Sequence, residues 1–97
     1  MAYCVYMLIS KHNNKLFSYV GYTKNLKKRI NLHNISRGAK YTRGKKWIVF
    51  HKENYNTKSE AMSREYQLKN DKKFRNSLRE KFKLINKNKF FLKNKIQ

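Results

Sequence analysis

The stretch Tyr19–Asn34 reads YVGYTKNLKKRINLHN, and it determines much of the fold expected of this chain. A short apolar strand ends in a glycine, and a basic helix follows it. Helical spacing places Arg29 and His33 one turn apart on the same face of that helix. Tyrosine, arginine and histidine side chains that converge at a strand–helix junction can bind a phosphate and transfer a proton. The junction is therefore the first candidate for a catalytic site.

Three strands are predicted around this junction. Residues rich in Tyr, Val and Ile predict strands over Tyr3–Ser10 and Leu16–Tyr22, which the polar turn 11–15 joins as a hairpin. Alternating residues predict a third strand over Trp47–Tyr55. Between the basic helix and this strand, residues 36–46 form a loop with two glycines and many cations.

Three helices complete the predicted order. Asn25 is a suitable N-cap for the basic helix, which is expected to run from Leu26 to about Ile35. Thr57 and Glu60 have the spacing of a capping box, and their helix is expected to end near Asn70. A third helix is predicted from apolar residues at helical spacing: Phe74, Leu78, Phe82 and Ile85. Residues 86–97 carry many Lys and Asn and no caps, so a flexible basic tail is expected there.

The composition indicates one domain that binds a polyanion. The chain has 97 residues, with 25 Lys and Arg against 5 Asp and Glu, for a net charge of +20. Nucleic acid is the partner that such a charge favours, ahead of an anionic membrane. An AT-rich genome alone explains the abundance of Lys and Asn, but it does not explain the scarcity of acids.

Compartment and membrane association follow from what the sequence contains. Its single cysteine, Cys4, forms no internal disulfide or cysteine-rich zinc module, and we expect it to be a buried apolar residue. No apolar run approaches the roughly 20 residues of a membrane span, and residues 1–10 make a poor signal peptide. We expect a cytoplasmic protein that associates with the bacterial nucleoid through DNA.

Glu65 is the most unusual residue for its position. It lies three residues after Met62 and three before Leu68, so it is expected to share their buried helix face. A buried carboxylate is costly unless it is paired or binds a metal. A salt bridge to one of the many cations is the simpler interpretation. The alternative is a Mg²⁺ site, since Mg²⁺ often binds through one or two carboxylates together with water and phosphate oxygens.

The remaining candidates also have structural alternatives. Arg29 could lie in solvent, but its place beside the apolar face of its helix suggests that it points across the sheet toward a phosphate. His33 could be a packed histidine. Tyr6 and Tyr19 lie on adjacent strands, where aromatic pairs usually pack. A dense cation cluster would lower the pKa of a tyrosine and make it an acceptor for a proton from water.

Cations next to these residues are expected to contact nucleic-acid phosphates, which gives weak base preference. Gly38 and Gly44 would let backbone amides approach the DNA closely. The residues predicted to contact nucleic acid are Lys24, Lys27, Lys28, Arg37, Lys40, Tyr41, Arg43, Lys45 and Lys46.

The ordered motifs resemble the GIY-YIG nuclease superfamily. They are Val5-Tyr6, Tyr19-Val20-Gly21, the run from Tyr22 to Leu26, Gly38–Gly44, Ser59-Glu60-Ala61 and Arg64-Glu65. Within it, the chain is similar to small stand-alone bacterial GIY-YIG proteins and to the catalytic subunit of the eukaryotic branched-DNA nuclease. Cys4 stands where the name of the first motif has glycine.

The resemblance implies an α/β fold with a central three-stranded antiparallel sheet flanked by helices, in the order β-β-α-β-α-α. Residues 1–85 would form the GIY-YIG nuclease domain. Tyr6 matches the tyrosine that activates water, Tyr19 its supporting tyrosine, and Arg29 the phosphate-binding arginine. His33 matches a histidine near the nucleophile. Glu65 matches the sole metal-binding carboxylate, for Mg²⁺ or Mn²⁺.

The function expected from these residues is metal-dependent hydrolysis of DNA phosphodiester bonds, in repair or recombination on branched or damaged DNA. A non-catalytic nucleic-acid-binding module on the same fold is the alternative, and a basic RNA-associated structural protein is a third possibility.

Some relatives carry an Asn beyond the metal carboxylate, and Asn70 and Asn76 are both candidates for it. Whether a protein partner or a larger nuclease complex is needed is left open, as are the preference for branched or duplex DNA and the oligomeric state.

Overall fold

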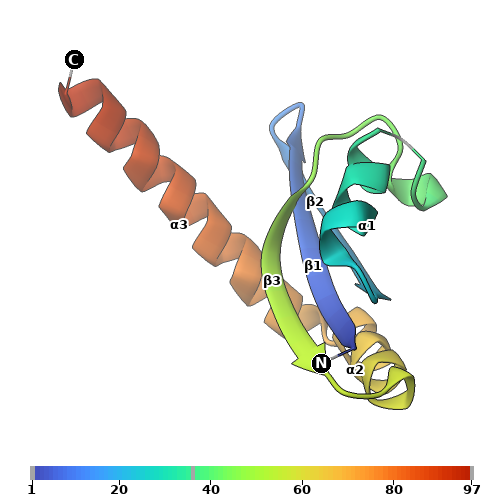
Figure 1. Cartoon of the computed structure of the whole chain (residues 1–97). Coiled ribbons are helices and arrows are strands. Elements are labelled where there is room, and N and C mark those ends of the chain that lie inside the picture. The colour runs from blue at the N-terminus through green and yellow to red at the C-terminus, as the bar shows by residue number, and fades with distance from the viewer. Residues whose placement is uncertain (1, 36, 97) are drawn as a thin grey trace.

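A three-stranded antiparallel sheet lies at the centre of the computed structural model, which describes residues 2–35 and 37–96, with side chains up to residue 85 (Figure 1). The elements follow the chain as β1 (Tyr3–His12), β2 (Lys15–Thr23), α1 (Leu26–Asn34), the single 3₁₀ turn η1 (Lys40–Thr42), β3 (Ile48–Tyr55), α2 (Lys58–Asn70) and α3 (Lys72–Ile96). The strand order is β2-β1-β3. The predicted α/β class and the predicted order of strands and helices are therefore confirmed.

The hairpin is tighter than the sequence suggested. Its turn consists of Asn13 and Asn14 alone, because Lys11, His12 and Lys15 belong to the paired strands. Both asparagines have positive φ angles, of 51° and 63°. Two-residue hairpin loops favour this conformation because it matches the twist of the strands, and asparagine tolerates it better than most residues. The turn fixes the register that aligns Tyr6 with Gly21.

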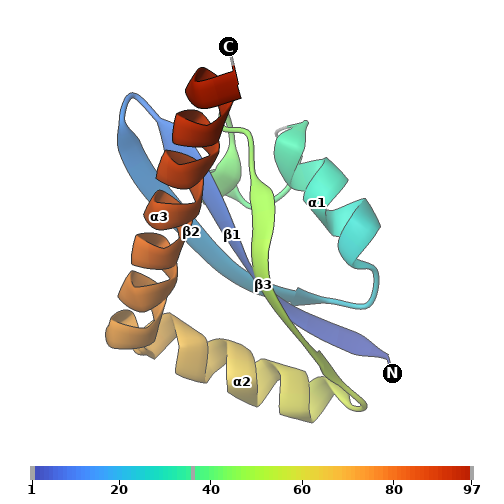
Figure 2. The same ribbon diagram turned by 90° about the vertical axis from the view of Figure 1, so that its left-hand side faces the viewer.

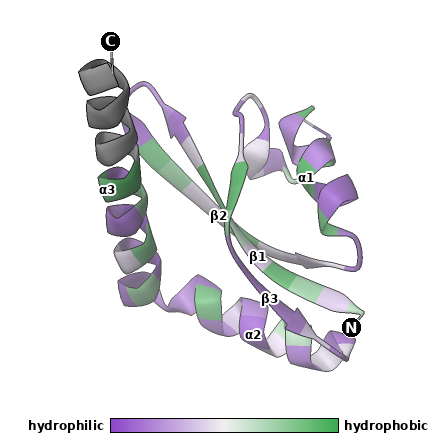
Figure 3. Ribbon diagram, turned by 60° about the vertical axis from the view of Figure 1, so that its left-hand side comes forward, coloured by the Kyte–Doolittle hydropathy of each residue, from purple (hydrophilic) through white to green (hydrophobic). Residues whose placement is uncertain are grey.

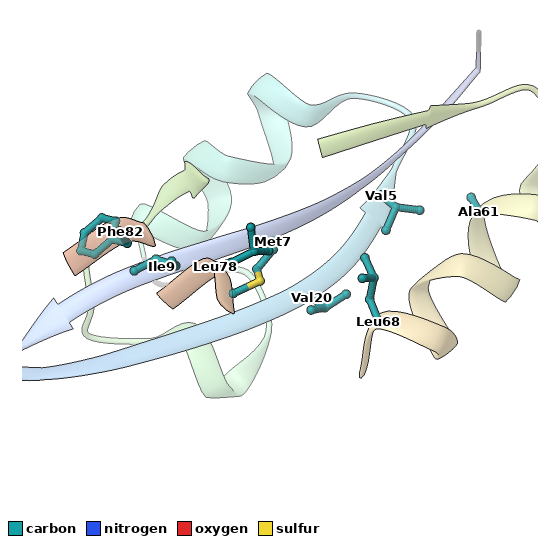
Figure 4. Packing of buried hydrophobic residues seen from close by; sticks show 8 residues of the cluster. All are labelled: Val5, Met7, Ile9, Val20, Ala61, Leu68, Leu78 and Phe82. Atoms are coloured by element: carbon teal, nitrogen blue, oxygen red, sulfur yellow. The ribbon is translucent and has the colours of Figure 1, made fainter. Parts of the chain in front are cut away.

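The central strand, β1, contributes residues to two separate cores, because successive side chains of a strand point to opposite faces of the sheet. Val5, Met7 and Ile9 face α2 and α3, where they pack with Val20, Ala61, Leu68, Leu78 and Phe82 (Figure 4). Cys4, Tyr6 and Leu8 face the opposite side, where Leu26 and Ile30 of α1 pack. Cys4 is buried and free, as expected. The continuous apolar run of β1 thus reflects burial on both faces of the sheet.

The helices cover these two faces unequally. Figure 2 shows α3 on one side of the sheet and α1 on the other, with α2 crossing below. The caps of α1 and α2 are those predicted: the Asn25 side chain accepts from the Lys28 amide, and Thr57 with Glu60 forms a complete capping box. Along the helices, hydrophobic positions are interspersed among hydrophilic ones (Figure 3).

The third helix is longer than predicted. It continues to Ile96, so the backbone of residues 86–96, for which a flexible tail was predicted, is helical. The expected basic surface of 86–97 concerns side chains outside the described residues, and the domain boundary at residue 85 stays a prediction. Within the described ranges, no helix combines the length and apolar character needed to cross a bilayer.

Candidate active site

Tyr6 lies at the centre of the α1-facing side of the sheet, and Gly21 makes room for it. The two residues are cross-strand partners on β1 and β2. A Cβ atom on Gly21 would lie 2.5 Å from the Tyr6 phenol oxygen and 3.1 Å from the Tyr19 ring. Only glycine therefore lets the Tyr6 side chain lie across β2 beside Tyr19, whose ring centroid is 6.5 Å away. The predicted proximity of the two tyrosines is present in the structure.

Helix α1 brings the next two residues to these phenols. Leu26 and Ile30 pack against the core that contains Tyr6, which fixes the rotation of the helix. On the same side, His33 is fully buried and Arg29 is partly buried. The His33 ring lies 5.0 Å from that of Tyr19 and 6.0 Å from that of Tyr6, measured between centroids. Helical spacing thus predicted correctly that Arg29 and His33 share one face.

A chain of three hydrogen bonds runs through His33. The Thr42 hydroxyl donates to the Ala39 carbonyl at 2.8 Å, so its oxygen is left to accept from His33 Nδ1, also at 2.8 Å. Burial lowers the pKa of His33 and the Arg29 charge lowers it further, so the imidazole is neutral. Its Nε2 then carries a lone pair, and the Tyr6 hydroxyl, 3.0 Å away, donates to it.

Thr42 and Gly38, which hold His33 in place, were not recognised as site residues from the sequence. A Cβ atom on Gly38 would lie 2.5 Å from His33 Nδ1, so the loop approaches the imidazole closely only because residue 38 is glycine. Thr42 is fully buried at the end of η1, and the Trp47 indole donates to its carbonyl at 2.9 Å. The motif Gly38–Gly44 contains both positions, but it does not show their role, because their contacts with His33 form only in the folded chain.

The pKa of Tyr6 differs from the prediction. The sequence suggested that surrounding cations would lower it, but burial raises it to about 12, and Arg29 offsets only part of this effect. The negative charge of Glu65, on α2, is a smaller contribution in the same direction as burial. Tyr6 is therefore a neutral phenol near neutral pH, with its proton directed at His33.

Arg29 is partly buried and interacts with both tyrosines. A hydrogen bond with the Tyr6 phenol raises the pKa of Arg29 more than burial lowers it, and Tyr19 acts in the same direction. The guanidinium is therefore held at the edge of the site as a permanent cation. Its remaining N–H groups can bind an oxyanion in the bidentate manner typical of arginine.

Glu65 lies at the edge of α2 rather than on a fully buried face. The prediction that Met62 belongs to the inner face is wrong, because Met62 is 47% exposed and Ala61 and Leu68 alone are buried on this helix. The Glu65 side chain is 19% exposed, and its carboxylate forms an ion pair with Lys69 at 3.1 Å. It is thus accessible enough to change partners.

The donor set fits a hard cation whose ligands come mostly from substrate and water. Among the described residues, no group of three His, Cys, Asp or Glu could hold a metal, so a cation bound at Glu65 would take most of its ligands from elsewhere. Mg²⁺ commonly binds through one or two carboxylates together with water and phosphate oxygens, which is compatible with this arrangement. Zn²⁺, which needs three or four protein ligands, is not.

The two candidate asparagines are both engaged locally. Asn70 Nδ2 donates to the Tyr66 carbonyl at 2.8 Å, in the last turn of α2. Asn76 Oδ1 accepts from Arg79 at 2.6 Å, in α3. Neither contact connects the amide with Glu65, so the role predicted for one of them stays a prediction.

The residues predicted to contact nucleic acid lie just before and at the start of α1 and in the loop that follows it. Lys24, Lys27 and Lys28 are exposed at the start of α1, as predicted. Of the loop residues in the predicted set, Lys45 is the least exposed, and its ammonium lies 4.8 Å from the Phe17 ring centroid and 5.6 Å from the Tyr41 ring centroid. The other loop residues of the predicted set are exposed: Arg37, Lys40, Tyr41, Arg43 and Lys46.

Comparison with known proteins identifies the family. The chain is 44% identical over 66 residues to a UPF0213 protein of Staphylococcus haemolyticus, covering 67% of this chain and 77% of the relative. A UPF0213 protein of Bacillus velezensis is 43% identical over 65 residues, covering 66% and 63% respectively. One from Halobacterium salinarum is 48% identical over 52 residues, covering 53% and 68%. No solved structure matches significantly. The GIY-YIG catalytic domain matches residues 2–79, and the chain therefore belongs to this family, which is part of a nuclease superfamily.

Proposed function

We propose that this protein is a metal-dependent DNA endonuclease that hydrolyses phosphodiester bonds in repair or recombination, on branched or damaged DNA. One observation carries the proposal. Tyr6, Tyr19, Arg29 and His33 come from three elements, and they meet at one point. DNA binding does not require a buried phenol–imidazole hydrogen bond beside an arginine, whereas hydrolysis can use one to move a proton.

The hydrogen-bond directions define a path for the proton. A water bound at the Tyr6 oxygen would give its proton to that oxygen, while Tyr6 passes its own proton to His33 Nε2. The hydroxide oxygen then forms a bond to phosphorus as the opposite P–O bond breaks, and the leaving oxygen takes a proton from solvent. This exchange avoids a free phenolate, which the raised pKa of Tyr6 disfavours.

Arg29 would bind the scissile phosphate beside this path. Its charge would offset the negative charge that develops on the phosphate oxygens during attack, a contribution worth roughly 10²–10³-fold in rate for one well-placed donor. Tyr19 would help to orient the guanidinium, since both phenols act on it. Lys24, Lys27, Lys28 and the loop cations would hold the neighbouring phosphates.

Glu65 would hold the divalent cation, Mg²⁺ or Mn²⁺, that nucleases of this family generally use. Bound there, the ion would supply positive charge at the phosphate and the leaving oxygen. Lys69 would release the carboxylate, a small cost because an exposed i,i+4 ion pair contributes only about 0.3–0.5 kcal/mol.

The test is a cleavage assay on end-labelled flap, splayed-arm, four-way-junction and continuous duplex DNA, with Mg²⁺ or Mn²⁺. We expect metal-dependent cutting by the wild type and none by Glu65→Gln, which should still bind DNA because it removes no positive charge. Glu80→Gln is the matched control, since Glu80 is an exposed acid paired with Lys83 in α3. It should cut at the wild-type rate.

Two outcomes would contradict the proposal. Cutting by Glu65→Gln at the wild-type rate would show that the carboxylate is not the metal ligand. Binding of every substrate with no cutting, by the wild type and in both metals, would favour the non-catalytic binding module.

A further inference from the structure

Tyr41 is a large aromatic residue that remains exposed beside the buried site. Its side chain is 51% exposed, although Thr42, the next residue, is fully buried. The Tyr41 ring lies nearly parallel to that of Tyr19, at an interplanar angle of 22° and a centroid distance of 6.3 Å. Trp47 supports it from another direction, with ring centroids 6.2 Å apart. The ring is thus backed by two aromatic side chains while half of its surface faces solvent.

The backbone holds this ring in a fixed position. Tyr41 is the middle residue of η1, where the Thr42 amide donates to the Ala39 carbonyl at 3.0 Å. The Trp47 indole bonds to the Thr42 carbonyl, and the Trp47 backbone is bound on both sides by the Asn34 amide, at 2.6 and 3.1 Å. A ring on such a rigid support loses little conformational entropy when a ligand stacks on it.

Positive charge surrounds the exposed surface of the ring. The Lys45 ammonium lies 5.6 Å from the ring centroid, and Lys40 and Arg43 flank Tyr41 in the exposed loop. A fixed aromatic face among cations that can contact a phosphate backbone is the arrangement that binds unstacked nucleotides. A base inside a continuous duplex cannot use it, because both of its faces are covered by neighbouring base pairs.

We propose that Tyr41 is a stacking subsite for a base that has left the duplex stack, next to the scissile phosphate. The placement rests on the proposed function, since it takes the phosphate to lie at Arg29 and Tyr6. From there, Tyr19 leads directly to Tyr41 through ring contacts. The subsite would make the protein prefer DNA with an unpaired nucleotide at the cut position over continuous duplex, independently of base identity.

The test is a binding measurement that requires no cleavage. The full chain, in EDTA, is titrated into a flap DNA that carries 2-aminopurine as the first unpaired base, and into a continuous duplex of equal length. Stacking on Tyr41 should quench the fluorescence of the probe. Tyr41→Leu keeps apolar bulk against Tyr19 and Trp47 but removes the aromatic face, whereas Tyr41→Phe keeps that face. Tyr66→Leu is the matched control, because Tyr66 is a 70% exposed tyrosine on α2.

We expect Tyr41→Leu to lose the quenching and to lower the flap-to-duplex affinity ratio by roughly 5- to 100-fold. Tyr41→Phe and Tyr66→Leu should behave as the wild type. Equal losses on flap and duplex, or quenching retained in Tyr41→Leu, would overturn the inference. Because no cutting is involved, this result is independent of the cleavage assay. Base stacking on Tyr41 can be absent while DNA cleavage is observed, and stacking can be observed while cleavage is absent.

Discussion

The Tyr6 phenol is neutral in the free protein although the neighbouring Arg29 favours its ionisation. Arg29 lowers its pKa, yet burial outweighs this effect and raises the pKa to about 12, while the neutral phenol donates its hydrogen bond to His33. Such a phenol cannot collect a proton from water unless it releases its own proton at the same time. His33 is the acceptor for that proton, so the tautomer of His33 decides whether Tyr6 can act as a base.

Thr42 sets this tautomer, which leads to a testable prediction. Thr42→Val removes the acceptor for His33 Nδ1–H at nearly constant volume, and the buried imidazole should then move its proton to Nε2. In that form it cannot accept from Tyr6. We expect the cleavage rate constant to fall roughly 100-fold with little change in DNA affinity. Cleavage assays on pre-bound substrate, with ¹⁵N NMR of the imidazole to identify the tautomer, would check this.

Thr42→Ser is the control, because it keeps the hydroxyl and should retain both the Nδ1–H tautomer and most of the activity. A purely structural role for Thr42 would lower the thermal stability of both variants and leave the tautomer unchanged. An Nε2–H tautomer in the wild type would contradict the proposed proton path itself.

At the scale of single residues, the sequence identified the side chains of the site but not their environment. Arg29 and His33 were predictable because helical spacing is a local property. The raised pKa of Tyr6 was not, since it depends on burial beneath α1, and burial follows from packing between distant segments. Thr42 and Gly38 were missed for the same reason, because their contacts with His33 form only when the loop after α1 folds back onto that helix.

At the scale of elements, Glu53 connects β3 with α2. Its two carboxylate oxygens accept from Arg64 at 2.7 and 3.1 Å, and His51 lies 2.7 Å away. The Tyr55 hydroxyl donates to the same group. These partners, Arg64 first, lower the pKa of Glu53 to about 2 from its ordinary 4.5. The carboxylate therefore helps to place the helix that carries Glu65.

We predict that Glu53→Gln lowers the free energy of unfolding by about 1–3 kcal/mol at neutral pH, the range for a lost charged hydrogen-bond network. Because folding depresses this pKa, the stabilisation is fully present above pH 4.5 and is lost as the pH falls toward 2. The gap between wild type and variant should therefore narrow over that interval. Urea unfolding at a series of pH values measures it.

Glu80→Gln serves as the control for this experiment, since its pair with Lys83 is exposed and should contribute less than about 1 kcal/mol. A gap that stayed constant from neutral pH to pH 2 would show that the Glu53 charge contributes nothing to stability.

Helix ends could be predicted from the sequence, whereas helix faces could be predicted only in part. The caps at Asn25 and Thr57 depend on neighbouring residues alone, and both are present. The inner face of α2 depends on where the sheet lies. Met62 is therefore exposed although it is apolar, and Ala61 takes the buried position. Likewise, α3 continues past residue 85 to Ile96, and no residue pattern around position 85 indicates where the helix ends.

At the scale of the whole molecule, a net charge of +20 on 97 residues has two consequences of opposite sign. Repulsion among cations destabilises the free fold, and salt reduces it by screening. The same charge supplies most of the affinity for DNA, which salt weakens as counterions compete for the phosphates. Adding salt should therefore stabilise the free protein while it weakens the complex.

We predict that the melting temperature of the free protein rises with salt, while log Kd for duplex DNA increases linearly with log salt, by about 0.9 per phosphate contacted. Lys27→Gln and Lys28→Gln, at the exposed start of α1, should each lower that slope by about 1. Lys58→Gln, at the start of α2, should leave it unchanged. Thermal unfolding and fluorescence anisotropy across a salt series measure both effects. Equal slope changes in all three variants would mean that DNA contacts spread beyond the side of the molecule that carries Tyr6 and Arg29.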